Sequence, residues 1–301
     1  MKLTTKNLII ILVVLGAAYG VTQFTKRSGR SKSLRSELVS IDTANVSKVE
    51  ISSTGGEVTL NETAEGWMVN LADGSQKLAK QSSVTSLLTS LNTIEPGRLA
   101  AKTEDKWKDY AVDSAGTRVK VYEGDAVSTD IVIGRFGMEG QQSFYTFVRL
   151  FEDEEVYVAN NFMGMSIGKD PSAYRENTLL RLEKDSLTSI SFNYPDSSFT
   201  LAKNERWYLD NQPADSASVV KYLNDLNFLT SRKFYDKSIT ANPTHTVTYS
   251  FSNQPEITME GYAIGEEMIV KSSENQNESF SDDALRKKVF KGKTAFSPTS
   301  E

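Results

Sequence analysis

The chain contains no cysteine and a single histidine, His245, among its 301 residues. Without cysteine, a disulfide framework, thiolate-ligated zinc, an iron–sulfur cluster, a cysteine nucleophile and a lipidated-cysteine anchor are all excluded. One histidine cannot form an ordinary zinc site, and as a general base it would need a nucleophile or acid within reach. We therefore expect no metal, no other cofactor and no catalytic residue, and we expect that the protein is not an enzyme.

A basic excess is also missing, since the net charge is -5 and neither half of the chain is rich in lysine and arginine. Nucleic acid is therefore not an expected partner. Neither Gly-x-Ser-x-Gly nor Ser-x-x-Lys stands out, so a hydrolase has no support beyond the presence of acidic residues. The acidic run Glu152–Glu155 lacks the alternating ligands and central glycine of a calcium loop. We interpret this run as a solvated turn.

One long apolar run is present, at residues 7–24, and it carries no charge. A spanning helix needs about 17 residues or more. We expect a short tail at 1–6, a transmembrane anchor at 7–24 and a basic, mobile linker at 25–40. A cleaved signal peptide is the alternative, because Lys2 and Lys6 precede the run and Ala17-Ala18 resembles a cleavage site. Apolar residues continue past Ala18, which favours an uncleaved anchor.

The charges around this run leave its orientation open. Five basic residues follow it, whereas two lysines precede it. The positive-inside rule alone would keep the body in the cytoplasm, but long domains translocate against such a bias. A short cationic tail before an apolar core is typical of exported proteins. We expect a single-pass protein of the inner (cytoplasmic) membrane whose body is extracytoplasmic.

The body of the chain contains the same pattern of elements twice. The segment Ser83–Asn92 is echoed by Ser218–Asn227, and a tryptophan strand precedes each copy, at Trp67 and Trp207. A strand of alternating apolar residues precedes each tryptophan in turn. The same order of three element types indicates an internal repeat.

Each copy contains one amphipathic segment, at residues 79–94 and 214–229. Val84, Leu87, Leu88 and Leu91 recur at the spacing of one helix face. Asp215 or Ser216 is the expected N-cap of the second helix. Short alternating strands fill the remainder. We therefore predict an α+β fold in which an N-terminal transmembrane helix precedes two related repeats, each an antiparallel sheet with a packed helix. The expected boundaries are 41–182, 183–286 and a loose C-terminal tail at 287–301.

Three residues are candidates for contact with a partner. Trp67 and Trp207 occupy matching repeat positions and therefore suit core packing, whereas Trp107 has no counterpart. Residues 134–140 are rich in glycine, and strands are expected on both sides, so we interpret them as a flexible hairpin loop. Phe136 and Met138 would be exposed apolar contacts on that loop.

Several motifs of the body resemble a known bacterial family, the domain of unknown function 4340. They cover residues 40 to 230 approximately. The similar segments are the strand Val46–Ile51, the pair Gly66-Trp67, the helix Ser83–Leu91, the strand end Ile131–Gly134, the strands Tyr145–Arg149 and Val156–Val158, and the segment Tyr174–Leu180. Members often carry Tyr-Gly-Leu where this chain has Tyr110-Ala111-Val112. The resemblance therefore leaves open whether this chain forms the same turn at that point.

The resemblance implies no known catalytic residue. Its members are often encoded beside an ABC-transporter permease and a gliding-type auxiliary component, which implies an accessory role in the cell envelope. We therefore expect a membrane-anchored accessory or binding component of a bacterial envelope complex, with the permease and ATPase of an ABC-type transporter as partners. The alternative is a stand-alone extracytoplasmic module that binds a glycan or peptide in the cleft between the repeats.

Overall fold

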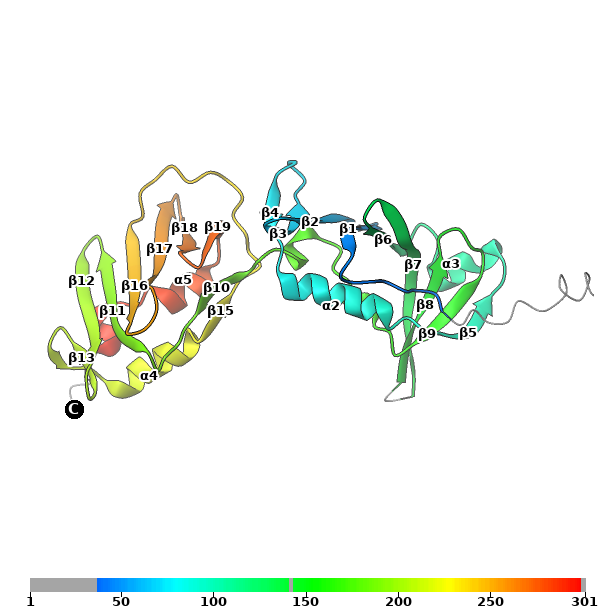
Figure 1. Ribbon diagram of the computed structural model, residues 1–301. Coiled ribbons are helices and arrows are strands. Elements are labelled where there is room, and N and C mark those ends of the chain that lie inside the picture. The colour runs from blue at the N-terminus through cyan, green and yellow to red at the C-terminus, as the bar shows by residue number, and fades with distance from the viewer. Residues whose placement is uncertain (1–36, 141–142, 299–301) are drawn as a thin grey trace, which may run out of the picture.

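The computed structural model describes residues 37–140 and 143–298, which form two lobes side by side (Figure 1). The first lobe comprises residues 37–177 and the second lobe residues 178–298. Each lobe has its own cluster of buried hydrophobic side chains. The lobes therefore have separate cores.

The first lobe is built on a nine-stranded sheet in which every neighbouring pair is antiparallel. In order across the sheet, the strands are β4 (Gln76–Leu78), β3 (Gly66–Asn70), β2 (Gly56–Thr63), β1 (Val46–Ser53), β6 (Thr117–Glu123), β7 (Ala126–Glu139), β8 (Ser143–Leu150), β9 (Val156–Asn160) and β5 (Pro96–Ala101). The helical segments are α2 (Gln81–Asn92), η1 (Glu104–Lys106), α3 (Trp107–Tyr110), η2 (Gly164–Ser166) and η3 (Pro171–Ala173).

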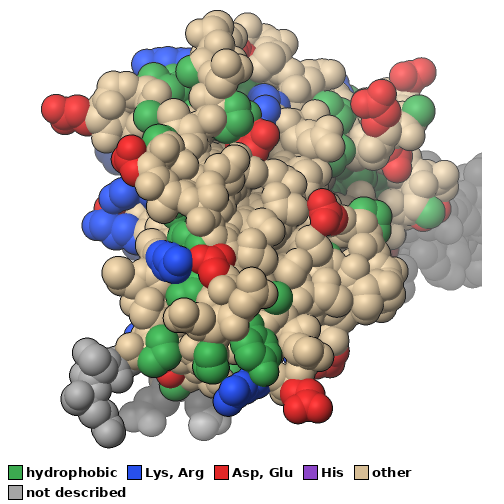
Figure 2. Space-filling view, turned by 90° about the vertical axis from the view of Figure 1, so that its left-hand side faces the viewer, with side chains coloured by type: hydrophobic (Ala, Val, Ile, Leu, Met, Phe, Trp, Pro, Cys, Tyr) green, Lys and Arg blue, Asp and Glu red, His purple; other side chains and the backbone are tan. Residues whose placement is uncertain are grey.

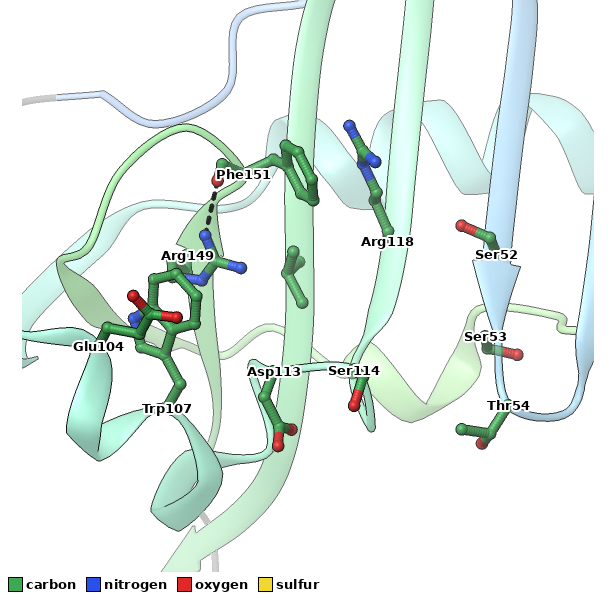
Figure 3. A pocket seen from close by; sticks show the side chains of 12 residues that line it. Ser52, Ser53, Thr54, Glu104, Trp107, Asp113, Ser114, Arg118, Arg149 and Phe151 are labelled. Atoms are coloured by element: carbon green, nitrogen blue, oxygen red, sulfur yellow. Dashed lines mark hydrogen bonds between the residues drawn. The ribbon is translucent and has the colours of Figure 1, made fainter.

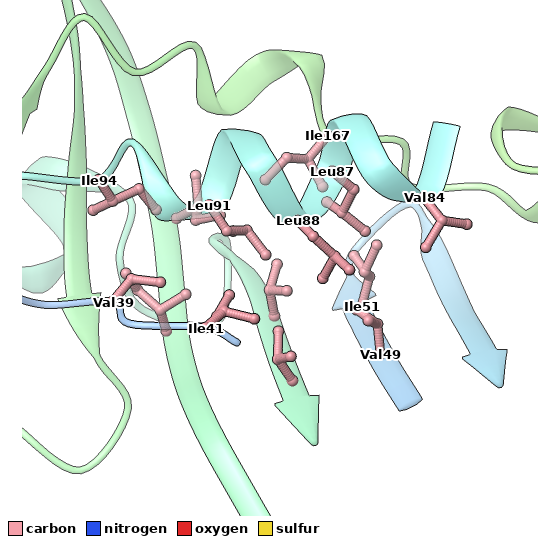
Figure 4. Packing of buried hydrophobic residues seen from close by; sticks show 14 of the residues in the cluster. Val39, Ile41, Val49, Ile51, Val84, Leu87, Leu88, Leu91, Ile94 and Ile167 are labelled. Atoms are coloured by element: carbon pink, nitrogen blue, oxygen red, sulfur yellow. The ribbon is translucent and has the colours of Figure 1, made fainter. Parts of the chain in front are cut away.

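Helix α2 packs on one face of this sheet. Its four buried residues, Val84, Leu87, Leu88 and Leu91, follow the helical period. They contact the inward side chains of β1, Val49 and Ile51, in the same cluster (Figure 4). Burial of one leucine contributes about 1.5–3 kcal/mol, so this stripe holds the helix on the sheet.

The opposite face of the sheet carries a smaller buried cluster. Val132, Phe147 and Val158 belong to it, and Trp107 and Tyr110 of the α3 region pack against them. Strands β7, β8 and β9 therefore bury side chains on both faces, whereas β1 and β2 do so on one.

The second lobe has an eight-stranded antiparallel sheet. In order across the sheet, the strands are β14 (Gln212–Pro213), β13 (Trp207–Leu209), β12 (Ser197–Lys203), β11 (Leu187–Tyr194), β16 (His245–Phe251), β17 (Ile257–Ile264), β18 (Glu267–Ser272) and β19 (Asn275–Phe280). A two-stranded sheet joins β10 (Thr178–Arg181) to β15 (Phe228–Thr230). The helical segments are α4 (Ser216–Asp225), α5 (Asp283–Val289) and η4 (Lys293–Phe296).

The two sheets share one topology. Reading from β4 and from β14, eight successive strands of the first sheet match the eight strands of the second in order and connection. Helices α2 and α4 follow the matching strands β4 and β14. Trp67 on β3 and Trp207 on β13 are both buried at matching positions. The last strands differ, because β5 pairs with β9 whereas β15 pairs with β10.

The predicted α+β class is wrong. The described chain is mainly antiparallel β-sheet, and each large sheet is covered by helices of 12 residues or fewer. The helical period stands out in a sequence because it repeats over several turns. A short strand gives a weaker signal, although the strands together make up most of this fold. The two helices therefore give a stronger sequence signal than their share of the fold.

Among the described residues, no helix is both long and apolar enough to cross a membrane. The segment 7–24, for which we predict an anchor, lies outside the described ranges.

Both ends of the described body are more ordered than expected. Leu38 and Val39, expected in a mobile linker, are buried against the core of the first lobe. Val289 and Phe296, expected in a loose tail, are at most 1% exposed in the core of the second lobe. Isolated apolar residues in polar segments give no periodic pattern, which is why the sequence did not reveal this packing.

Candidate functional site

A cavity of about 580 Å³ opens on the face of the first lobe opposite α2. Strands β1, β6, β7 and β8 supply Ser52, Arg118, Val132 and Arg149, and the α3 region supplies Trp107 (Figure 3). The predicted contact residue Trp107 therefore lies in a cavity. The sequence did not predict the other lining residues, because sheet pairing assembles them from segments far apart in the chain.

An alternating stack of aromatic rings and guanidinium groups forms one wall of this cavity. The guanidinium carbon of Arg149 lies 3.7 Å from the ring centroid of Trp107 and 5.8 Å from that of Phe151. On Phe151, the guanidinium of Arg118 lies 3.2 Å from the ring centroid. Cation–π attraction of this kind is worth about 0.5–2 kcal/mol per contact. The stack fixes all four side chains.

Arg149 is the centre of this stack and is only 3% exposed. Its guanidinium donates hydrogen bonds to the backbone carbonyls of Val112, Leu150, Phe151 and Asp153. Burial lowers the pKa of Arg149. Arginine nevertheless stays protonated in proteins, so its guanidinium is a cation beside the cavity.

The acidic run Glu152–Glu155 forms the turn between β8 and β9, and it is held from both sides. Trp107 Nε1 donates to the carbonyl of Glu154 at 2.9 Å, and Arg149 Nη1 donates to the carbonyl of Asp153 at 3.0 Å. Two backbone carbonyls of the run thus accept hydrogen bonds from side chains that line the cavity. Within the described residues, no group of three or more histidine, cysteine, aspartate or glutamate side chains could hold a metal ion.

The glycine-rich segment 134–140 is not the predicted flexible loop. Strand β7 continues to Glu139, and residues 136–139 pair with residues 143–146 of β8. The end of the β7–β8 hairpin, beyond the last pair of β8 with β9 at Tyr145, projects from the sheet (Figure 1). The register of β7 against β8 shifts between Ile133 and Phe136. A shift of this kind, a β-bulge, bends a strand without ending it, so β7 continues through the glycine-rich segment.

The hairpin exposes apolar side chains at its outer end. Met138 is 63% exposed. Phe136 is half-buried, and its ring packs against that of Phe144 with centroids 6.1 Å apart. Trp107 lies on α3, at the opposite end of the sheet from the hairpin tip (Figure 1). The structure therefore does not bring the three predicted contact residues together.

Gly134 and Ala111 lie where α3 meets β7, and both have restrained backbone positions. A Cβ on Gly134 would lie 2.3 Å from the carbonyl oxygen of Tyr110, so only glycine lets α3 pack on β7. Ala111 ends α3 in the left-handed conformation, with φ at 51°. The question raised about this turn is thus answered, since the turn is formed here with alanine.

His245 lies at the start of β16 among aromatic rings. Its ring centroid is 4.9 Å from that of Tyr194 and 5.6 Å from that of Phe290. The Nδ1 atom is 2.9 Å from the hydroxyl of Thr244. Burial lowers the pKa of His245, so the ring is largely neutral near pH 7.

A second cavity, of about 420 Å³, lies where the lobes meet. Serines of α2, among them Ser83 and Ser86, line it on one side, and Arg232 lines it on the other. Its other lining residues all belong to the first lobe, so this cavity is mainly a feature of that lobe at its junction with the second. The end face of the second lobe carries interspersed acidic and basic side chains (Figure 2), which gives no surface of a single charge there.

Comparison with known proteins identifies the chain at the level of family. A family model described as a domain of unknown function (DUF4340) matches residues 70–254. No curated protein and no solved structure matches the chain. The resemblance seen in the sequence motifs is confirmed, and the protein belongs to the family of the domain of unknown function 4340.

Proposed function

We propose that this protein is a non-catalytic accessory component of a bacterial envelope complex and that it binds a partner protein through the β7–β8 hairpin. The observation that carries the proposal is the exposure of Met138, at 63%, on a projecting strand pair. Exposed apolar side chains that gather at one place commonly mark contact surfaces.

The pairing of the hairpin supports this function. Met138 and Glu139 of β7 pair with Phe144 and Ser143 of β8, beyond the last pair of β7 with β6, at Ile133, and the last pair of β8 with β9, at Tyr145. Among the described residues this end of the hairpin has no further strand beside it, and such a strand pair is marginally stable in water. A partner that covers Phe136 and Met138 would bury apolar surface and stabilise the pair. Aromatic residues and methionine are enriched at the centres of such interfaces.

The partners that the family resemblance implies are the permease and ATPase of an ABC-type transporter. The proposal includes a body outside the cytoplasm, next to the inner membrane, because a short cationic tail before an apolar run is typical of exported proteins. Attachment to the membrane would raise the effective concentration of the hairpin near a permease. Membrane fractionation and accessibility labelling of a cysteine introduced at Ser75 test this location.

Crosslinked affinity purification of the full-length protein from native membranes tests the partner contact. We expect recovery of a permease and its ATPase with the wild type and a clear loss with Met138→Asp. Val220→Asp is the matched control, because Val220 is 51% exposed on α4 of the other lobe. Equal recovery with both variants would refute the hairpin as the contact. A preparation without any partner would refute the accessory role.

A second candidate function is a stand-alone extracytoplasmic module that binds a glycan or peptide. The observation that favours it is the cavity of about 580 Å³ beside Trp107. Small-molecule sites have volumes of about 300–1000 Å³. This cavity lies on the first lobe, whereas the sequence led us to expect a ligand between the repeats.

A further inference from the structure

The cavity beside Trp107 has a wall that is already rigid. Trp107, Arg149, Phe151 and Arg118 alternate in one stack, and Arg149 is tied to backbone carbonyls. A ligand would therefore order few side chains on binding. Preorganisation of this kind raises affinity because less conformational entropy is lost.

Several polar groups along the cavity have unused hydrogen-bonding capacity. Arg118 engages Asp130 through Nε and Nη2, and within residues 37–140 and 143–298 its Nη1 atom has no protein acceptor. In the same ranges, the hydroxyls of Ser52, Thr54 and Ser114 make no hydrogen bond to the protein. These groups line one cavity. They form a set of donors and acceptors for a ligand.

The formal charges that line the cavity balance. Arg118 and Arg149 contribute two positive charges, and Glu104 and Asp113 contribute two negative charges. A balanced lining gives no strong preference for an anion or a cation. Guanidinium and carboxylate groups instead form strong hydrogen bonds with neutral hydroxyl groups. The chemistry fits a neutral ligand that is rich in hydroxyls.

The cavity also offers apolar surface. Trp107 is half-buried, Phe151 is 37% exposed, and Val132 adds a buried aliphatic side chain to the lining. A sugar ring matches this combination, because its C–H face is apolar and its rim carries hydroxyls. We propose that this cavity binds a neutral saccharide. This inference narrows the second candidate function to one ligand class, and it does not depend on the partner contact of the β7–β8 hairpin.

Tryptophan fluorescence provides the first readout. Trp67 and Trp207 are 5% and 7% exposed, so Trp107 is the tryptophan that a ligand in the cavity would affect. The full-length protein is purified in a detergent without a sugar headgroup, because a glycoside detergent would compete. The probes are cellobiose, maltose and N,N′-diacetylchitobiose, with glucuronate, inorganic phosphate and a glutamate-rich peptide as charged comparisons.

We expect at least one of the neutral disaccharides to change the fluorescence and to bind in isothermal titration calorimetry, and the charged probes to do neither. The change should be absent in Trp107→Phe. Binding of a charged probe alone would overturn the assignment, and so would the absence of binding by all three disaccharides.

Variants locate the site independently of the fluorescence. Asp113→Asn keeps the acceptor for the backbone N–H of Ala115 but removes the charge, and we expect about tenfold weaker disaccharide binding by calorimetry. Lys221→Ala, on the surface of α4, is the matched control and should bind as the wild type does. Equal affinities for the Asp113 variant and the control would show that the saccharide binds elsewhere and would overturn the proposal. Partner recovery by crosslinking should be unchanged in Asp113→Asn, which separates this test from that of the hairpin.

Discussion

The guanidinium of Arg175 donates to both carboxylate oxygens of Glu278, from Nε to Oε1 at 2.9 Å and from Nη2 to Oε2 at 2.5 Å. Arg175 belongs to the first lobe, where its backbone bridges Ala79, and Glu278 lies on β19 of the second lobe. Asp236 accepts two further bonds from the same guanidinium. Both residues of the first pair are buried, at 4% and 1% exposure. This cluster joins the lobes.

Replacement of Arg175 by methionine should lower the free energy of unfolding by about 3–5 kcal/mol, because it leaves the buried carboxylate of Glu278 without its principal partner. Urea denaturation measures the loss. Lys48→Met is the control, since Lys48 and Glu50 form an ion pair whose side chains are 34% and 38% exposed, and loss of this pair should cost less than about 1 kcal/mol. Similar losses for the two variants would contradict this role of Arg175.

Replacement of Ala111 by glycine should raise the free energy of unfolding by about 0.5–1 kcal/mol. Ala111 has a φ of 51°, and the left-handed conformation costs alanine roughly 1–2 kcal/mol, part of which the greater freedom of glycine in the unfolded chain offsets. Thermal and urea denaturation check the gain. Ala217→Gly, within α4, should have the opposite sign; a loss of stability at both positions would show that the turn at Ala111 is not strained.

Replacement of Gly134 by alanine should destabilise the first lobe by about 1–3 kcal/mol, as overpacking of a tight contact does. The new Cβ would meet the carbonyl oxygen of Tyr110 at 2.3 Å and a methyl group of Val112 at 2.6 Å. Gly292→Ala is the matched control, because a Cβ at Gly292 would have no atom of another described residue beyond its chain neighbours within 4 Å. Unchanged denaturation of Gly134→Ala would mean that α3 does not pack on β7 as described.

Alkaline pH should destabilise the second lobe. Burial raises the pKa of Tyr222 and of Tyr249 above the ordinary value of 10, and their hydroxyls lie 3.1 Å apart. Because the folded pKa is raised, the stabilising contribution is complete below pH 10 and is lost as the pH rises further. At pH 11 the loss is about 1.4 kcal/mol for each tyrosine.

Urea denaturation at pH 9 and pH 11 measures this dependence. The double variant Tyr222→Phe/Tyr249→Phe should lose less stability between these two pH values than the wild type, whatever its stability at pH 9. An equal loss in both proteins would assign the alkaline sensitivity to other groups.

Local patterns in the sequence identified much of the fold. The helix predicted at 79–94 is α2 at Gln81–Asn92, and the one predicted at 214–229 is α4 at Ser216–Asp225. Asp215, one of two expected N-caps, accepts a hydrogen bond from the backbone N–H of Ala217. Helices and their caps depend on residues close together in the chain. The spacing of apolar residues and the type of the capping residue therefore reveal them.

Features that depend on distant segments were missed. Gly134 looked like part of a flexible loop because its restraint comes from Tyr110, which packs on it from α3. The cavity joins Ser52, Trp107 and Arg149 through the registers of β1, β6, β7 and β8. Trp107 was the one lining residue with a local signal, since it is a tryptophan without a counterpart in the second copy.

Site-specific photocrosslinking in living cells tests the central claim most directly. A photoreactive amino acid is placed at position 138 on the β7–β8 hairpin or at position 220 on α4, both of which are exposed in the wild type. We expect a crosslink from position 138 to a membrane-transporter subunit and none from position 220. No crosslink from position 138, or the same crosslinked products from both positions, would contradict the hairpin as the contact with a partner.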